Sequence, residues 1–388
     1  MDLELLDNSL AAAGEPAFRA AQVWRWTAGG AQGYEAMSNL PRALREHLAC
    51  DVPFSSLTLQ REARARDGTV KVLFATADGR PLEAVLMRYR NPPGGGNLGS
   101  GGNPPGSRIG RRSICLSSQS GCPLTCTFCA TGRMRFARNL TASEILDQAL
   151  HFRRIERVDH CVFMGMGEPL LNLDAVLEAC ARLPDLGITH RRTAISTVGW
   201  IPGIEKLTEC EMPLRLALSL HAADEALRSE LMPVNERYPL RDVLEACRAH
   251  YARKRRRIFI EYVMLAGVND RYEQALVLAR LLRSPDHTQM FKVNLIPYNP
   301  TGGRPAPYTR DASAAGIDGK ETGGRPVPDA RPAGETGGDG AVAYTGSGRA
   351  AIAAFKAALE EHGLQATVRL TRGREIDAAC GQLAAASA

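Results

Sequence analysis

The spacing of hydrophobic and polar residues changes along the chain, and these changes predict where one structural domain ends and the next begins. Residues 1–55 carry apolar side chains at helical spacing, as in FRAAQVWRW at 18–26, and predict a small helical domain, either a plain packed bundle or an accessory domain that contacts RNA. Asn39 is the expected N-cap of its last helix, with Pro41 just inside. In residues 56–90, apolar and polar side chains alternate with a period of two. Asp67-Gly68 and Asp78-Gly79 within this stretch favour tight turns. They therefore predict a β-hairpin extension that follows the helices.

From about residue 111, apolar strand-like segments alternate with amphipathic helical segments. The strand-like segments are 160–165, 193–197, 215–221, 258–265 and 291–297, and Thr141 with Glu144 forms a capping-box pattern at the start of one helix. Such alternation is typical of parallel βαβ units. Residues 111–300 therefore predict an α/β fold built as a partial or complete barrel. The active site of such a barrel lies at the carboxyl ends of its strands.

Two low-complexity segments interrupt this pattern. Residues 91–110 consist mainly of Gly, Pro, Ser and Asn and predict a flexible linker. Residues 301–346 contain the related strings GGRPAP and GGRPVP and predict a disordered insertion. Residues 347–388 then predict a helix, a strand and a tail that carries Cys380.

Composition narrows the class of protein. No apolar run in the 388 residues approaches the ~20 that a membrane span requires, and the acidic start MDLELLDNSL does not resemble a secretory signal. We therefore expect a cytoplasmic protein without membrane contact. Ten cysteines in such a chain indicate metal or redox sites rather than a disulfide framework. A net charge of +6 permits a nucleic-acid partner without demonstrating one.

The strongest chemical signal is the loop CLSSQSGCPLTCTFC at residues 115–129. Cys122, Cys126 and Cys129 have the spacing C-x3-C-x2-C. Three cysteine sulfurs can hold three irons of a 4Fe–4S cluster and leave the fourth iron open to a small molecule. A structural zinc site would need a fourth ligand, for which Cys115 is the nearest candidate. The spacing favours a redox-active cluster.

Other candidate residues have an ordinary structural interpretation when each is taken alone. Glu83 lies in a predicted strand, where a lone carboxylate is typically solvated. His221, at a strand end, would be a structural histidine, and Cys380 would be a small buried apolar residue.

Taken together, several motifs resemble the RlmN-type adenosine methyltransferases of the radical S-adenosylmethionine (SAM) superfamily. They are CLSSQSGCPLTCTFCATG with Phe128 before the third cysteine, FMGMGEPLLN, LALSLHA, EYVMLAGVND, NLIPYNP and TRGREIDAACGQL. Only 91–110 and about 301–346 fall outside the resemblance. It implies a partial (β/α)6-type barrel and a 4Fe–4S cluster on Cys122, Cys126 and Cys129, with SAM on the fourth iron.

The resemblance also assigns roles to individual residues. The positions that match SAM-binding residues are Gly167, Glu168, Ser196, Ser219, Leu220, His221 and Asn299. Cys380 matches the cysteine that carries the methyl group, Cys115 matches the cysteine that frees the product and forms a disulfide with Cys380, and Glu83 matches the base. Val198 departs from the family, which usually has a small hydroxyl residue there, so we expect a changed local hydrogen bond.

By the same resemblance, one SAM methylates Cys380, and a second SAM yields a radical that activates this methyl group for addition to the adenine ring. The expected product is methylated at carbon 2 of an adenosine in the peptidyl transferase centre of 23S rRNA and of the adenosine next to the anticodon in tRNA. A reducing system such as flavodoxin or ferredoxin and a monomeric enzyme are also expected.

Two other functions remain open on the sequence. The related enzymes that methylate carbon 8 of the ribosomal adenosine share the cysteines and the SAM motifs. The second alternative is a non-catalytic iron–sulfur protein that binds RNA, although such a protein would have no use for Cys380. RNA contact is expected from Arg133, Arg135 and Arg138 around Phe136, whereas the run Arg253–Arg257 is equally consistent with a solvated helix end.

Overall fold

The computed structural model describes residues 1–90, 109–283, 289–301 and 344–384. The predicted linker at 91–110 and the predicted insertion at 301–346 lie almost wholly outside these described residues. Within the described ranges, no helix has the length and apolar character needed to cross a membrane.

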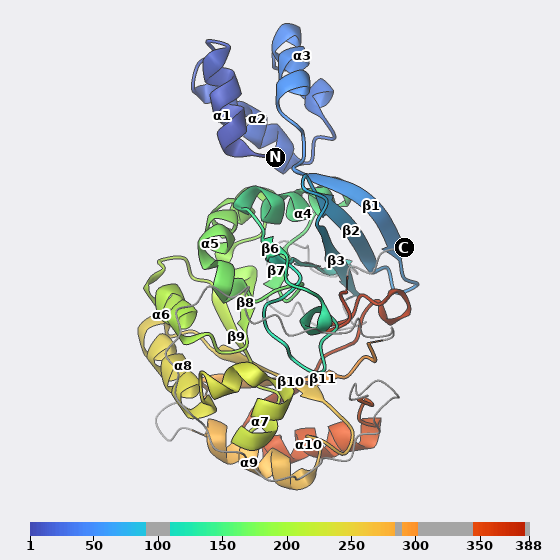
Figure 1. The fold of residues 1–388 in the computed structure, drawn as a ribbon, viewed down its shortest axis with the longest axis vertical. Coiled ribbons are helices and arrows are strands. Elements are labelled where there is room, and N and C mark those ends of the chain that lie inside the picture. Colours follow the sequence, from blue (N-terminus) through green and yellow to red (C-terminus); the bar gives the residue numbers. More distant parts are fainter. Residues whose placement is uncertain (91–108, 284–288, 302–343, 385–388) are drawn as a thin grey trace.

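The N-terminal part is a small helical unit that stands at one end of the molecule (Figure 1). Its helices are α1 (Leu3–Ala12), α2 (Phe18–Gly29) and α3 (Arg42–Asp51), with the short η1 (Tyr34–Ala36) between the last two. They enclose an apolar core of their own that includes Leu6, Val23 and Leu48. The expected cap of α3 is wrong, because Pro41 occupies the N-cap and the Asn39 side chain instead accepts a hydrogen bond from Trp26 Nε1 at 2.6 Å.

One sheet runs through the rest of the described chain in the order β1-β2-β3-β4-β7-β8-β9-β10-β11-β12. The strands β1 (Leu57–Arg64), β2 (Val70–Thr76), β3 (Pro81–Arg90) and β4 (Ile109–Cys115) are antiparallel neighbours. The strands β7 (His160–Phe163), β8 (Thr193–Thr197), β9 (Arg215–Ser219), β10 (Ile258–Met264), β11 (Phe291–Pro297) and β12 (Gln365–Val368) continue in parallel from β4. The hairpin extension is therefore continuous with the barrel sheet.

Helices cover the outer face of the parallel strands (Figure 1). They are α4 (Ala142–Ile155), α5 (Leu173–Arg182), α6 (Ile201–Glu209), α7 (Glu225–Leu231), α8 (Leu240–Lys254), α9 (Tyr272–Leu282) and α10 (Arg349–Glu361). Thr141 and Glu144 form the predicted capping box of α4. In the part of the chain that is described, β12 has no second strand neighbour, so the sheet does not close. This arrangement confirms the predicted partial α/β barrel.

Short elements complete the connections. The strands β5 (Gln119–Ser120) and β6 (Arg138–Asn139) pair in a separate antiparallel ladder, and Cys122, Cys126 and Cys129 lie between them in the sequence. The 3-10 turns are η2 (Thr131–Arg133), η3 (Pro169–Asn172), η4 (Leu183–Leu186), η5 (His190–Arg192), η6 (Pro233–Glu236) and η7 (Arg374–Ile376).

Candidate active site at the carboxyl ends of the parallel strands

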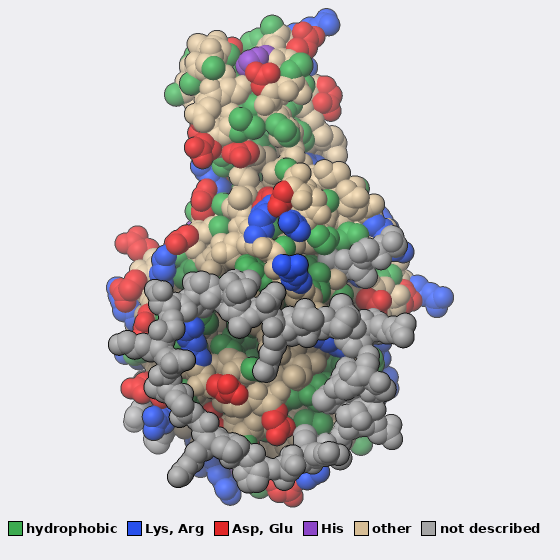
Figure 2. Space-filling model, viewed as in Figure 1, with side chains coloured by type: hydrophobic (Ala, Val, Ile, Leu, Met, Phe, Trp, Pro, Cys, Tyr) green, Lys and Arg blue, Asp and Glu red, His purple; other side chains and the backbone are tan. Residues whose placement is uncertain are grey.

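A cavity with about 760 Å³ of empty space opens at the carboxyl ends of the parallel strands. The predicted residues that line it are Gly167, Glu168, Ser196, Ser219, His221, Cys129 and Cys380. Leu220 is fully buried and lines neither this cavity nor the neighbouring one, which Asn299 lines. The face in Figure 2 is hollowed over these strands.

Glu168 is the N-cap of η3 and follows the end of β7. The carboxylate accepts hydrogen bonds from the Leu170 and Val198 backbone N–H groups at 3.1 and 3.0 Å. Burial raises the pKa of Glu168 to about 7, against the lowering effect of these bonds. The Val198 side chain packs in an apolar cluster with Phe128, so this bond to Glu168 needs no hydroxyl at position 198.

Ser196, Ser219 and His221 come from the next two strand ends. The two serine hydroxyls lie 3.2 Å apart. His221 Nδ1 accepts a hydrogen bond from the Val263 N–H at 3.0 Å, which leaves the proton on Nε2 in the neutral ring. Burial, aided by the charge of Arg228, lowers the pKa of His221 to about 3. The ring meets Phe128 edge-on at 4.7 Å and thereby supports the residue before Cys129.

The three clustered cysteines lie beside one another in the cysteine loop. Burial raises the pKa of Cys126 well above its usual value, and the neighbouring Cys129 and Cys122 raise it further. Among the described residues, no three His, Cys, Asp or Glu side chains form a site for a single metal ion. Three adjacent thiols in a loop are nevertheless the donor set that a 4Fe–4S cluster uses, and iron stabilises the thiolates that burial disfavours. The residues present thus fit the cluster.

Backbone contacts hold this loop against its surroundings. Thr127 N donates to Leu231 O of α7 at 3.0 Å, and Ala130 N donates to Gly381 O of the tail at 2.8 Å. A Cβ atom on Gly132 would lie 2.7 Å from Cys126 O, so only glycine fits there without a shift of the loop.

Arg228 is a residue that the sequence analysis missed. It is fully buried on α7 and donates to Val198 O at 2.6 Å, to Leu220 O at 3.2 Å and to the Asn235 side chain. Burial lowers the pKa of Arg228 to about 10, and the nearby Cys126 opposes this change. Arg228 thus connects the ends of β8 and β9 by hydrogen bonds and places a positive charge near Cys126. Its only sequence signal was its place three residues before Leu231, on the buried face of a short helix.

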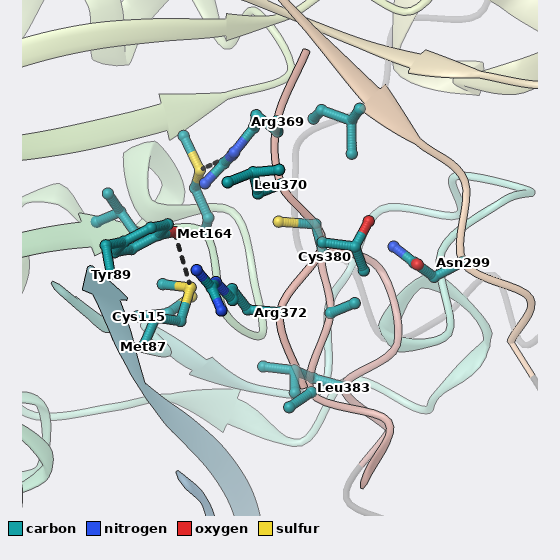
Figure 3. A pocket seen from close by; sticks show the side chains of 15 residues that line it. Met87, Tyr89, Cys115, Met164, Asn299, Arg369, Leu370, Arg372, Cys380 and Leu383 are labelled. Atoms are coloured by element: carbon teal, nitrogen blue, oxygen red, sulfur yellow. Dashed lines mark hydrogen bonds between the residues drawn. The ribbon is translucent and has the colours of Figure 1, made fainter. Parts of the chain in front are cut away.

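Cys115 and Cys380 line a second cavity with about 540 Å³ of empty space, in which both thiols are free (Figure 3). Cys115 ends β4, and burial, followed by the charge of Cys380, raises its pKa to about 12. Cys380 comes from the tail. It raises the pKa of Arg369, whose Nη1 also contacts Met164 Sδ at 3.2 Å and Glu261 at 3.3 Å. Cys380 lines both cavities and so joins them.

Glu83 is buried, with 4% of its surface exposed, so the solvated-strand interpretation is wrong. Its carboxylate pairs with Lys71 Nζ at 3.0 Å and accepts a hydrogen bond from Ala384 N at 3.0 Å. Thr131 also contacts the tail, because its hydroxyl donates to Leu383 O at 2.5 Å. Glu83 therefore faces the tail and lines neither cavity.

The basic residues after the cysteine loop do not behave alike. Arg138 pairs with Asp78 at 2.6 Å and with Glu144 at 2.8 Å, so its charge is already compensated. Arg133 contacts the Thr301 hydroxyl. Arg135 is exposed and, with Phe136, lines a shallow hollow beside Arg80.

Comparisons with known proteins cover the chain from end to end. Residues 116–279 match the radical SAM superfamily, and residues 1–52 match the ribosomal RNA large subunit methyltransferase N-terminal domain. A probable dual-specificity RNA methyltransferase RlmN of Moorella thermoacetica is 40% identical over 96% of this chain and 93% of its own. A probable dual-specificity RNA methyltransferase RlmN of Thermus thermophilus is 38% identical over 98% of this chain and 92% of its own. The crystal structure of a radical SAM methyltransferase from Sphaerobacter thermophilus superposes with a TM-score of 0.79 at 36% identity, covering 100% of this chain and 98% of that one.

Proposed function

This chain belongs to the RlmN-type family of radical SAM RNA methyltransferases, and on that premise we propose that it methylates carbon 2 of adenosine in 23S rRNA and in tRNA. The observation that carries the proposal is the position of Cys380. It faces Cys115 in one cavity and Glu168, Ser196 and Cys129 in the other. A sulfur in that position can receive a methyl group on one side and deliver it on the other.

The proposed cofactor site is the larger cavity. Cys122, Cys126 and Cys129 would hold the 4Fe–4S cluster, and Glu168 with the Gly167 backbone would receive the SAM amine. The other residues proposed to bind SAM are Ser196, Ser219, Leu220, His221 and Asn299. When bound, the cluster and SAM supply the radical that activates the methyl group. Glu168 and the serines orient SAM, while the buried His221 and Phe128 support the loop that carries Cys129.

Cys380 is proposed to carry the methyl group as a thioether. Its thiolate would take a methyl group from the SAM sulfonium, forming one carbon–sulfur bond as another breaks. The nucleophilic form of a cysteine is the thiolate. Arg369 lines both cavities together with Cys380, and Cys380 is the largest influence on the raised pKa of Arg369.

Cys115 is proposed to release the product. Its sulfur would attack the Cys380 sulfur, forming a disulfide as the bond from Cys380 to the transferred carbon breaks. The electron pair of the broken bond stays on the transferred carbon, which then takes up a proton to complete the methyl group on the adenine. Burial, with Cys380, raises the pKa of Cys115 to about 12, so the thiol must lose its proton as it attacks. A reducing system such as flavodoxin or ferredoxin would supply the electrons that the cycle requires.

Glu83 is proposed to take the ring proton. A general base must come within hydrogen-bond reach of that proton, directly or through one water. Oε2 of Glu83 now accepts from Ala384 N, so the tail must move before this oxygen can meet a substrate. Lys71 Nζ lies 3.0 Å from Oε1 and pairs with the carboxylate in this position.

Mass spectrometry of RNA nucleosides tests the function directly. The chain would be expressed in a strain that lacks its own enzyme of this family, and 2-methyladenosine should appear in both rRNA and tRNA. A product confined to carbon 8 would refute the proposed position. Cys380→Ala should abolish methylation, whereas the matched change at the exposed Cys50 should leave it intact. Cys126→Ala should prevent formation of 5′-deoxyadenosine from SAM and dithionite.

A further inference from the structure

The inner face of the barrel carries different side chains at the amino ends and at the carboxyl ends of its strands. Side chains alternate along a strand, so Arg111 shares the face of Cys115 on β4, and Arg215 shares the face of Ser219 on β9. Cys115 and Ser219 line the two cavities at the carboxyl ends. By the same alternation and by the parallel register, the residues at the amino ends of this face are Arg111, His160, Arg215, Phe259 and Lys292. The amino-end mouth of the barrel is therefore mainly basic.

The arginines at this mouth repel one another. Burial lowers the pKa of Arg215, and the charge of Arg111 lowers it further. Burial also lowers the pKa of Arg256, and the charges of Arg215 and Arg191 lower it further. Arg215 Nε also donates a hydrogen bond to Arg191 O at 2.7 Å. We call Arg111, Arg191, Arg215 and Arg256 the arginine cluster. Like charges gathered in one place destabilise the fold unless an anion shares the site.

Compensation by acidic residues is weak at this mouth. Across the described ranges, no member of the arginine cluster forms an ion pair with a carboxylate. Two carboxylates between α4 and β7 are already engaged, Glu156 by Arg88 and Arg112, and Asp159 by His160. Arg256 Nε is buried without a hydrogen-bond partner among the described residues. These observations point to an anionic ligand.

The arginine cluster adjoins the methyl-transfer cavity. Arg111 stacks over the Tyr89 ring at 4.1 Å, and Arg372 of the tail stacks over the same ring at 5.3 Å. Tyr89 lines the cavity that holds Cys115 and Cys380, and Figure 3 shows Arg372 lying beside it. Cys115 lies four positions after Arg111 on β4, a span of about 13 Å at ~3.3 Å per residue. One unstacked nucleotide can bridge such a span, with its phosphate at the mouth and its base at the thiols.

We propose that the arginine cluster binds the RNA phosphates beside the target adenosine, so that the nucleotide enters from the amino ends of the parallel strands. The inference rests on the proposed function and adds the route by which its substrate arrives. Planar guanidinium groups suit phosphate, which they bind with two hydrogen bonds. An acidic electron-donor protein is the less suitable occupant, because the cysteine loop lies at the opposite ends of the strands.

The first test compares RNA affinity and its salt dependence. A fluorescent RNA stem-loop with an unpaired adenosine is titrated with wild type, with the double variant Arg111→Gln/Arg215→Gln and with Arg241→Gln. Arg241 is an exposed arginine on α8 that pairs with Asp242, so it is the matched control. The double variant should bind about tenfold or more weakly, and its salt slope should fall by about 0.7 for each lost phosphate contact on single-stranded RNA. Arg241→Gln should bind like wild type.

The second test needs no variant and remains valid if the double variant does not fold. The wild-type protein is modified with p-hydroxyphenylglyoxal, with and without the RNA, and the modified arginines are identified by mass spectrometry. RNA should protect Arg111 and Arg191 but not Arg241.

The outcomes separate the two proposals. Equal affinity and equal slope in the folded double variant, or no protection of the arginine cluster, would overturn the inference and leave the methyltransferase proposal intact. Protection by flavodoxin or ferredoxin instead of RNA would also overturn it. A wild-type chain that neither binds nor methylates RNA would refute the proposed function itself.

Discussion

Removing the hydroxyl of Thr131 should loosen the tail that carries Cys380. This buried hydroxyl donates to Leu383 O at 2.5 Å, next to the hydrogen bond of 2.8 Å from Ala130 N to Gly381 O. Thr131→Val keeps the shape of the side chain but leaves the buried Leu383 carbonyl without this donor, at a cost of about 1–3 kcal/mol. If local opening of the tail carries that cost, its equilibrium constant rises about 5- to 150-fold.

Hydrogen exchange measured by mass spectrometry gives the assay. Peptides that cover 374–384 should lose protection by that factor in Thr131→Val, while core strands such as β8 exchange as in wild type. The control is Thr27→Val, which removes a similarly buried hydroxyl that bonds to Val23 O at 3.1 Å in the N-terminal unit. Tail exchange at the wild-type rate in Thr131→Val would refute the reasoning that this bond fastens the tail.

Two further predictions concern pH and the cysteine loop. Burial lowers the pKa of His250 to about 4, so between pH 6.5 and 4 the unfolded chain binds more protons and stability is lost as pH falls. Urea unfolding should show about 2 kcal/mol less stability from this residue at pH 5 than at pH 7, and His250→Gln should lack that difference. Gly132→Ala would place Cβ 2.7 Å from Cys126 O, so reconstituted protein should bind less iron, whereas Gly29→Ala, with open space around it, should match wild type. Wild-type iron content in Gly132→Ala would contradict the steric argument.

Much of the fold is predictable because its determinants are local. The capping box at Thr141 and Glu144 sets the start of α4, and the apolar segments of β7 to β11 lie where the alternation places them. The grouping of Glu168, Ser196 and Ser219 around one cavity also follows from a general rule, since parallel strands end at the same edge. The motifs of the cysteine loop identify the family for a similar reason, because their spacing lies within a few residues.

The remainder depends on contacts between distant residues. Glu83 is buried because Lys71 comes from the neighbouring strand and Ala384 from the far end of the chain, and neither partner is visible in its own segment. Arg228 sits in a short helix whose pattern permits a solvated arginine, and only the converging carbonyls of β8 and β9 explain its burial. The arginine cluster likewise joins four segments, and nothing in the sequence shows that these segments meet.

The pairing of β3 with β4 has a consequence for how this chain can change in length. Arg90 is the register partner of Ile109, so residues 91–108 connect adjacent ends of neighbouring strands. Loop-closure entropy grows slowly with length, and cutting these eighteen residues to four would change the folding free energy by only about 1.3 kcal/mol. One residue inserted between Ser113 and Cys115 would instead turn Cys115 to the opposite face of the sheet. Insertions and deletions can therefore accumulate at 91–108, while a few positions farther along a single added residue would disable the enzyme.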